Sequence, residues 1–249
     1  MGTIGDAVKH QYVGDISDFE KFAILRALAA EADLPLAVCW MLTAPDEKGE
    51  GGRIDYLKQP ERYRHLDPHV FDRLSDIVGS EQRNVEAVEQ SGLLERAQFF
   101  TRPIEDHLDS RSAYFRELWP MIQERSLVFF DPDIGLASRS MRKGRKRSSM
   151  YVFDDELREG FLRGHSLVVF DHWKRVQRLP YLAEAFGRLS DAAGASSPFA
   201  LWGRERVAFF VLAQDTDAGA LEHAGRALAG RWQPLLTLTN AADLEQSSS

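Results

Sequence analysis

The sequence predicts an α/β protein with a single Rossmann-like domain of three layers over residues 13–240. We expect a mostly parallel central sheet with an antiparallel C-terminal strand. Apolar runs of strand length alternate with helical patterns along the chain, which is typical of a sheet built from βαβ units. Several runs are continuously apolar, as in parallel strands buried on both faces. The length of 249 residues suits one large domain, with a flexible N-terminus over 1–12 and a disordered tail over 241–249.

Capping signals define the helices in the first half of the chain. Ser17 and Glu20 have the spacing of a capping box, which predicts a helix that ends near Ala32. Asp67 and Pro68 predict the start of another helix, because proline is favoured in the first turn. The elements expected in this half are a helix over 17–32, a strand over 36–42, helices over 67–78 and 81–90, a strand over 97–101, and a helix from 112 that proline 120 kinks or interrupts.

The second half continues the alternation of strands and helices. Residues 126–130 and 166–170 are the clearest buried strands, since each is an unbroken apolar run after a serine. Gly194 is expected to end the helix that Pro180 begins. The elements expected in this half are strands over 126–130 and 166–170, helices over 154–163, 180–193 and 218–228, and strands over 199–202, 206–213 and 235–239.

Composition excludes several classes of protein. The formal net charge of −7 argues against a generic binder of polyanions. The single cysteine, Cys39, excludes disulfides and cysteine-based zinc sites, and it favours a cytoplasmic location. The sequence predicts neither a membrane span nor a signal-peptide core. His65 and His69 lack an evident third ligand, so no metal site is predicted.

Polar clusters follow the two clearest strands at the points where those strands end. The first cluster is Asp131-Pro132-Asp133, and the second is Asp171-His172. Ligands of parallel α/β sheets bind beyond the carboxyl ends of the strands, so the two clusters are expected to share a pocket if both strands are parallel. A structural interpretation stays open, because aspartate and proline also shape turns and cap helices.

A local concentration of positive charge follows the first cluster. The cations are Arg142, Lys143, Arg145, Lys146 and Arg147. Such clusters suit phosphate groups and other polyanions. A solvated surface loop is the alternative interpretation, but the position directly after the acidic turn favours a role in substrate binding.

The strand that ends in Asp-Pro resembles a motif of class I methyltransferases that modify exocyclic amines. In those enzymes a D/N-P-P-aromatic tetrapeptide ends the fourth strand. Asp131 and Pro132 keep the first two positions here, and Asp133 and Ile134 occupy the third and fourth. The resemblance implies that Asp131 and the carbonyl of Pro132 accept hydrogen bonds from the target amine, and that Asp133 belongs to the same catalytic turn.

A narrower similarity is to the bacterial large-subunit ribosomal RNA adenine-N6 methyltransferases. Their Gly-Asn-x-Ala-Asp-hydrophobic-x-Lys segment is similar to GDISDFEK here, in which Gly14, Asp18 and Lys21 match. That segment borders the S-adenosylmethionine pocket in the family, so the resemblance implies this cofactor. The family's glycine-rich motif is replaced here by TAPDEKGEGG, with only the threonine retained. The cofactor-binding residues implied in this way are Asp18, Lys21, Thr43 and Asp46.

The resemblance implies a methyltransferase that acts on an amine, carried by a nucleic-acid base. RNA or DNA would bind through the basic segment 142–147. Besides the five cations of that segment, the residues expected to bind substrate are Asp171, His172 and Arg175.

Two other classes remain open. A magnesium-dependent nuclease or phosphoesterase would use Asp131 and Asp133, with Glu156 or Asp171, as oxygen ligands. A noncatalytic binding member of the fold is the other, because the tetrapeptide and the glycine motif are both altered. Dependence on a divalent metal would indicate the first, and failure to bind any nucleotide cofactor would indicate the second.

Overall fold

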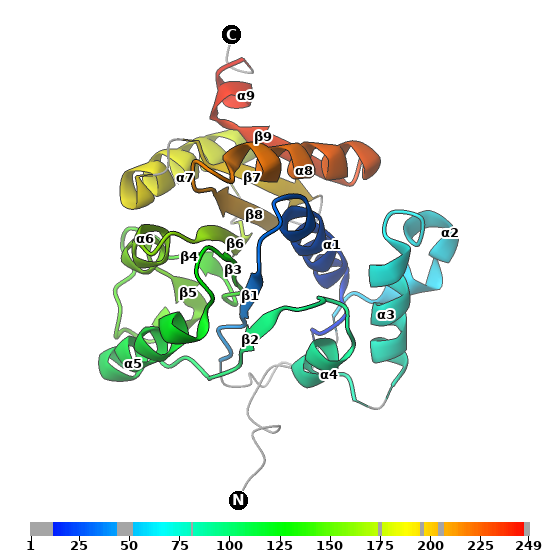
Figure 1. Cartoon of the computed structure of the whole chain (residues 1–249), viewed down its shortest axis with the longest axis horizontal. Helices are drawn as coiled ribbons and strands as arrows, with labels where there is room; N and C mark the ends of the chain where they lie inside the picture. The colour runs from blue at the N-terminus through cyan, green and yellow to red at the C-terminus, as the bar shows by residue number, and fades with distance from the viewer. Residues whose placement is uncertain are drawn as a thin grey trace, which may run out of the picture.

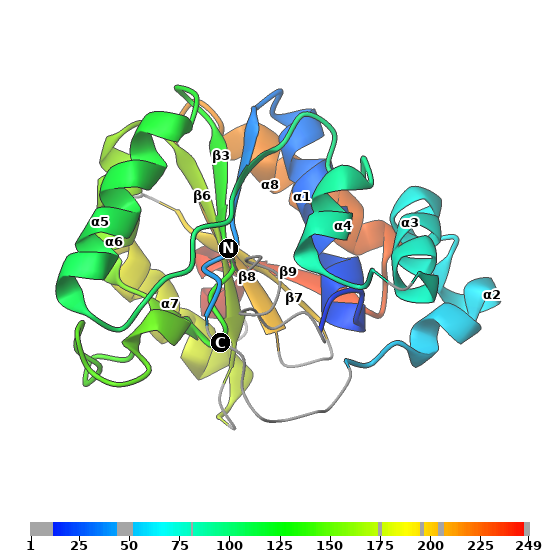
Figure 2. The same ribbon diagram turned by 90° about the horizontal axis from the view of Figure 1, so that it is seen from below.

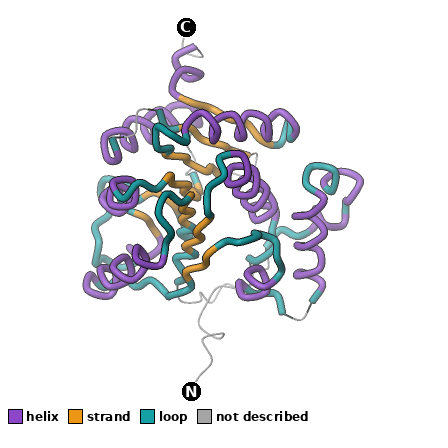
Figure 3. The backbone as a smooth tube through the Cα atoms, in the orientation of Figure 1, coloured by secondary structure: helices purple, strands orange, loops and turns teal. Residues whose placement is uncertain are grey.

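The computed structural model describes residues 12–43, 52–80, 82–173, 176–194, 197–203 and 207–246. Figure 1 shows a central sheet with helices on both sides. The strands are β1 (Leu36–Cys39), β2 (Gln98–Phe100), β3 (Leu127–Phe130), β4 (Gly135–Leu136), β5 (Tyr151–Val152), β6 (Ser166–His172), β7 (Phe199–Gly203), β8 (Val207–Leu212) and β9 (Leu236–Asn240). Seven of them form one sheet in the order β2-β1-β3-β6-β8-β7-β9, and β4 and β5 form a separate small sheet (Figure 3).

The sheet changes from parallel to antiparallel pairing along its width. Strand β1 pairs in parallel with β2 and β3, and β3 pairs in parallel with β6. The pairs β6–β8, β7–β8 and β7–β9 are antiparallel. The predicted Rossmann-like α/β fold is therefore confirmed. Its antiparallel part is larger than the one C-terminal strand we predicted, because β8 runs back beside β6 and β7 and β9 then add to it.

Two helical layers cover the sheet (Figure 2). One face carries α1 (Ile16–Glu31), α3 (Pro68–Gly79), α4 (Val85–Gln90) and α8 (Ala218–Arg231). The other face carries α5 (Leu108–Leu118), α6 (Asp154–Leu162) and α7 (Arg178–Ala193). The shorter elements are η2 (Asp55–Lys58), α2 (Pro60–Tyr63), η3 (Trp119–Met121), η4 (Ser148–Met150) and α9 (Ala241–Gln246). None of the described helices combines the length and the apolar character needed to cross a membrane.

Successive residues of the strands pack into opposite layers. In β3, Leu127 and Phe129 join the apolar cluster formed with α1 and α8. Val128 and Phe130 join the cluster formed with α5 and α7. All four side chains are fully buried. Burial on both faces explains why the sequence of this strand is continuously apolar.

Helix α1 begins earlier than we predicted. Its N-cap is Asp15, whose carboxylate accepts a hydrogen bond from the backbone N of Asp18 at 3.0 Å. Ser17, which we predicted as the cap, lies inside the first turn, and Glu20 is buried in the second. Asp15 accepts its hydrogen bond from the residue three positions later, which is the spacing expected for an N-cap.

The C-terminal tail is ordered further than predicted. Residues 241–249 were expected to be disordered, but Ala241–Gln246 form α9. Asn240 accepts a hydrogen bond from the backbone N of Asp243 at 2.9 Å, and the Asp243 carboxylate accepts one from the backbone N of Asn240 at 3.0 Å. This reciprocal cap starts the helix. Residues 1–11 and 247–249, which were also predicted to be flexible, lie outside the described residues.

Candidate active site

A cavity of about 530 Å³ opens at the carboxyl ends of β1, β3 and β6. The chain leaves β1 towards β2 on one side and leaves β3 towards β6 on the other. The cavity therefore lies at a topological switch point, where open α/β sheets bind their ligands. The N-terminus of α1 reaches the same edge. The polar lining includes Asp15, Asp18, Lys21, Thr43, Arg53, Asp131, Asp133 and His172.

Lys21 links α1 to the end of β3. Its Nζ donates to Oδ1 of Asp18 and to Oδ2 of Asp131, both at 2.8 Å. The second oxygen of Asp18 accepts the backbone N–H of Gly14 at 2.8 Å, so the carboxylate also fixes the turn before the helix. Lys21 is only 6% exposed. The ion pair between Lys21 and Asp131 thus connects α1 to the Asp131-Pro132-Asp133 turn at the cavity.

Aromatic rings surround the same ammonium group. The Nζ of Lys21 lies 5.1 Å from the ring centre of Phe170, and 5.8–5.9 Å from those of Phe22, Trp40 and Phe129. Burial alone would lower the pKa of Lys21, but Asp131 and Asp18 outweigh it and hold this pKa above its usual range. The residue therefore stays charged at neutral pH, in contact with carboxylates and ring faces.

Asp131 lines the cavity, and only one of its carboxylate oxygens bonds Lys21. Burial raises the pKa of its carboxyl to about 6, against the lowering effect of the Lys21 ammonium. Lys21 occupies Oδ2, and Oδ1 has no hydrogen-bond partner in the described part of the chain. The neighbouring Asp133 accepts a hydrogen bond from the Thr43 hydroxyl, which joins the loops after β1 and β3. A carboxylate with a pKa near neutral, facing a cavity, is suited to exchange protons with a ligand.

The cavity carries more negative than positive groups. Among its described lining residues, the carboxyl groups are those of Asp15, Asp18, Asp131 and Asp133, and the fixed cations are those of Lys21 and Arg53. Burial and the neighbouring Asp18 raise the pKa of Asp15 to about 6, and burial raises that of Asp131 to about 6, so these two carboxyl groups are largely ionised at neutral pH. The site therefore favours a ligand that carries positive charge.

His172 lies at the rim of the cavity, at the end of β6. Its ring packs edge-to-face against Phe170, with the ring centres 4.8 Å apart. Desolvation on the cavity side, together with the charges of Lys21 and Arg53, lowers the pKa of His172 to about 4. The exposed imidazole is therefore a neutral, planar group at neutral pH, which suits it to contact a planar ligand.

Seven of the fifteen residues predicted for the site come together at this cavity. Those that line it are Asp18, Lys21, Thr43, Asp131, Pro132, Asp133 and His172. Asp171 does not line it: this residue is 2% exposed, and its carboxylate accepts hydrogen bonds from the backbone N of Leu136 at 2.7 Å and from the Tyr181 hydroxyl. Its position holds β4 and α7 rather than a ligand. Asp46 and Arg175 lie outside the described residues.

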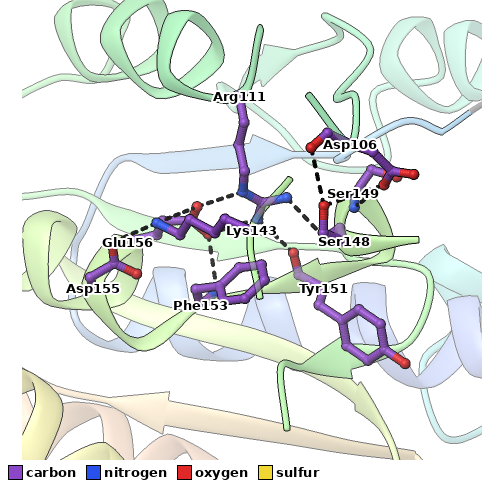
Figure 4. Close-up of polar contacts among 9 residues, drawn as sticks. All are labelled: Asp106, Arg111, Lys143, Ser148, Ser149, Tyr151, Phe153, Asp155 and Glu156. Carbon is purple, nitrogen blue, oxygen red and sulfur yellow. Dashed lines mark hydrogen bonds and ion pairs between the residues drawn. The ribbon is translucent and has the colours of Figure 1, made fainter. Parts of the chain in front are cut away.

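The predicted basic segment forms the connection from β4 to η4. Met150, the last residue of η4, lines the cavity. Lys143 is turned inward to an ion pair with Asp155 and Glu156 (Figure 4). The other four cations, Arg142, Arg145, Lys146 and Arg147, are exposed. The segment is therefore followed by a residue of the cavity, Met150, at its C-terminal end only.

The sequence did not single out several residues of the lining. Asp15 was missed because Ser17 was taken as the helix cap, although the spacing from Asp15 to Asp18 carries the same capping signal. Trp40 was assigned to a strand, and its indole N–H donates to Glu89 at 2.8 Å. Arg53 and Met150 gave no signal, because only the folded chain brings them to this edge.

Glu20 is a buried carboxyl beside the site. It is 4% exposed, and its Oε2 has no hydrogen-bond partner among the residues that the structure describes. It packs against Gly203, where an added Cβ would lie 2.5 Å from Oε2. Burial, and then the charge of Asp15, raise the pKa of Glu20 to about 8, although Arg53 lowers it.

We expect Glu20 to make stability fall as pH rises. The unfolded chain releases this proton near pH 4.5 and the folded chain near pH 8, so the folded state binds the extra proton between these values. The loss amounts to about 1.4 kcal/mol for each unit of pKa difference, up to a few kcal/mol in total. Urea unfolding from about pH 5 to about pH 8 should show that Glu20→Gln becomes progressively more stable than wild type. Parallel pH profiles for the two proteins would contradict this.

The carboxylates that a magnesium-dependent nuclease or phosphoesterase would use do not form one cluster. Glu156 is paired with Arg111, and Asp171 is bonded to Tyr181, whereas Asp131 is bonded to Lys21. Across the residues that the structure describes, no three His, Cys, Asp or Glu side chains are grouped so that they could hold a metal ion. The ammonium of Lys21 instead occupies the position between the carboxylates of the cavity.

Comparison with known proteins assigns no family. No protein-family model matches the sequence, and no curated protein matches it. We therefore infer the function from the geometry and charges of the cavity.

Proposed function

We propose that this protein is an S-adenosylmethionine-dependent methyltransferase that acts on an amine of a nucleic-acid base. The proposal depends mainly on the position of the Asp131 carboxylate. This carboxylate follows a buried central strand, belongs to a residue that lines a cavity at the switch point of the sheet, and is held in place by Lys21. The other properties of the cavity are consistent with this assignment.

The cavity fits the cofactor in size and in charge. Its volume of about 530 Å³ lies within the range of small-molecule sites. The cofactor supplies a methyl group on a positively charged sulfur, and the excess of carboxyl groups favours such a cation. Asp15, Asp18 and Thr43 would hold its polar groups, and Arg53 would face its carboxylate.

The chain's own groups would position the amine. Oδ1 of Asp131 and the carbonyl of Pro132 would accept its N–H groups, which fixes the direction of the nitrogen lone pair. Positioning of this kind provides most of the acceleration for a transfer that needs little acid–base chemistry. With a pKa of about 6, Asp131 can take the proton that the amine releases after transfer. Lys21 keeps Asp131 ionised before that step.

The substrate class is inferred from the exposed cations of the basic segment, which leads through η4 to the cavity residue Met150, and from His172. The exposed cations of the basic segment suit the phosphates of RNA or DNA. A base must leave its stack to enter the cavity, and the neutral ring of His172 gives it a planar surface to contact. The free and buried thiol of Cys39 is consistent with the reducing environment of the cytoplasm.

Calorimetric titration tests the cofactor assignment directly. S-adenosylmethionine and S-adenosylhomocysteine differ by a methyl group and one positive charge. We expect both to bind wild type with micromolar affinity. Asp15→Asn should weaken binding of S-adenosylmethionine on the order of fivefold and affect S-adenosylhomocysteine less, because one negative charge is removed. Asparagine caps helices as well as aspartate does, so α1 is retained.

Asp191→Asn is the matched control, since Asp191 is exposed on α7 away from the cavity. Its affinities for both compounds should equal those of wild type. Absence of binding by a folded wild-type protein would overturn the assignment and leave a noncatalytic binding function.

A further inference from the structure

A buried ion pair lies beneath the basic segment. Arg111 of α5 and Glu156 of α6 are 2% and 4% exposed. Their contact is bidentate: Nε to Oε1 at 2.6 Å and Nη2 to Oε2 at 2.8 Å (Figure 4). Burying two charges is costly, and apolar residues of similar size often stabilise a fold equally well. The pair therefore calls for an explanation besides stability.

The remaining bonds of the pair hold the chain that leaves the basic segment. Arg111 donates to the carbonyl of Ser148 at 3.0 Å and to that of Tyr151 at 2.7 Å. Glu156 accepts the backbone N–H of Phe153 at 3.0 Å. The pair thus fixes η4 and β5, which follow directly on the cations and include the cavity residue Met150.

Two further carboxylates hold the segment itself. Asp106, before α5, accepts the backbone N–H of Arg147 at 2.7 Å and that of Ser149 at 2.8 Å. Asp155 and Glu156 accept Nζ of Lys143 at 2.5 Å and 2.9 Å. Burial alone would raise the pKa of Asp106, but these backbone hydrogen bonds outweigh it and hold the pKa below its usual range. The segment is therefore clamped near its start, at Lys143, and at its end, at Arg147.

The clamped backbone presents the remaining cations to solvent. Arg145 and Lys146 are exposed and have no charged partner in the described part of the chain, and Arg142 and Arg147 flank them. A surface whose cations are already in place binds consecutive phosphates with a smaller loss of conformational entropy than a loop that must become ordered.

We propose that Arg111, Glu156, Asp106, Asp155 and Lys143 form a positioning network. It holds the four exposed cations of residues 142–147 as a preformed site for the phosphates of a single-stranded nucleic acid. The identity of this ligand rests on the proposed function. The five residues of the network act through the segment, and the exposed cations make the contact.

Replacing a clamp carboxylate by its amide separates positioning from simple electrostatics. Asp106→Asn and Asp155→Asn each remove a negative charge near the cations, so electrostatics alone would tighten the binding of a polyanion. Positioning predicts the opposite: about fivefold weaker binding of a fluorescein-labelled single-stranded RNA of mixed sequence, measured by anisotropy. The amides of Arg147 and Ser149 should exchange hydrogen faster in Asp106→Asn.

Asp109→Asn is the matched control, because Asp109 is exposed in the first turn of α5 and makes no clamp contact. It should bind the RNA as tightly as wild type or more tightly. The proposal is overturned if both clamp variants bind RNA as well as wild type, or if amide exchange at 147–149 is unchanged in Asp106→Asn.

The two proposals fail in distinguishable ways. RNA is titrated here without cofactor, and the cofactor titration uses no RNA. If wild type binds S-adenosylmethionine but no RNA, the phosphate site is overturned and methyl transfer needs another amine. If it binds RNA with the predicted variant effects but no cofactor, the positioning network stands and the methyltransferase assignment falls.

Discussion

Replacing Lys21 with methionine is expected to lower the free energy of unfolding by about 3–5 kcal/mol at neutral pH. Methionine keeps the contacts of the side-chain stem with the surrounding rings, but Asp18 and Asp131 lose their shared counter-charge. Lys21 lowers the pKa of Asp131, so this pKa should rise in the variant, and the loss should be larger at about pH 8 than at about pH 5. Urea unfolding at both pH values measures it, and titration of the same variant should show weaker binding of S-adenosylmethionine.

A double variant identifies the cause of that loss. If unpaired buried charge destabilises Lys21→Met, adding Asp131→Asn should restore part of the stability. Lys58→Met is the control for loss of a lysine, because the Lys58–Asp55 pair is largely exposed and should matter little. A double variant whose loss equals the sum of the two single losses would contradict the explanation.

Gly135→Ala is expected to lower the melting temperature by about 10 °C or to prevent folding. Gly135 follows the acidic turn with φ of +131°, where residues with a side chain are strained. An added Cβ would lie 2.6 Å from Cγ and 2.7 Å from Cα of Asp171. Because one of these atoms belongs to the backbone of β6, no change of rotamer relieves the clash. Circular dichroism on heating measures the effect.

Gly187→Ala controls for loss of a glycine. Gly187 lies in α7, where an added Cβ meets no atom within 4 Å. This variant should melt at the temperature of wild type or slightly above it, because alanine favours a helix interior. Equal melting temperatures for Gly135→Ala and wild type would contradict the prediction. They would mean that the turn at Gly135 can move away from β6 without loss of stability.

The fold could be predicted because its signals are local. The run that ends at Phe130 is apolar at every position, and in the structure both of its faces are covered. The interruption at Pro120 was also readable, since α5 ends at Leu118 and Pro120 lies in the turn η3. The extent of antiparallel pairing could not be predicted. The direction of a strand depends on the edge of the sheet at which the preceding connection ends, and composition does not determine that edge.

The sequence predicted the site residues at the strand ends but not the hydrogen-bond and ion-pair partners of the side chains. Asp131 and His172 follow from the rule that ligands bind at carboxyl ends. The same rule wrongly placed Asp171 in the site. It locates the residues at the end of a strand, but it does not predict which groups bind their side chains. Arg111 resembles an ordinary surface residue of a helix, and its burial depends on Glu156, which lies 45 positions away.

The contact between Lys21 and Asp131 joins residues 110 positions apart. It closes only when β3 lies in the sheet between β1 and β6, and such long-range closure is a slow part of folding. The carboxylate of Asp131, which we propose positions the substrate amine, thus becomes buried and charge-paired in the same event that completes the centre of the sheet. A chain that has not finished folding has no formed site, so it does not display a partly built one to ligands.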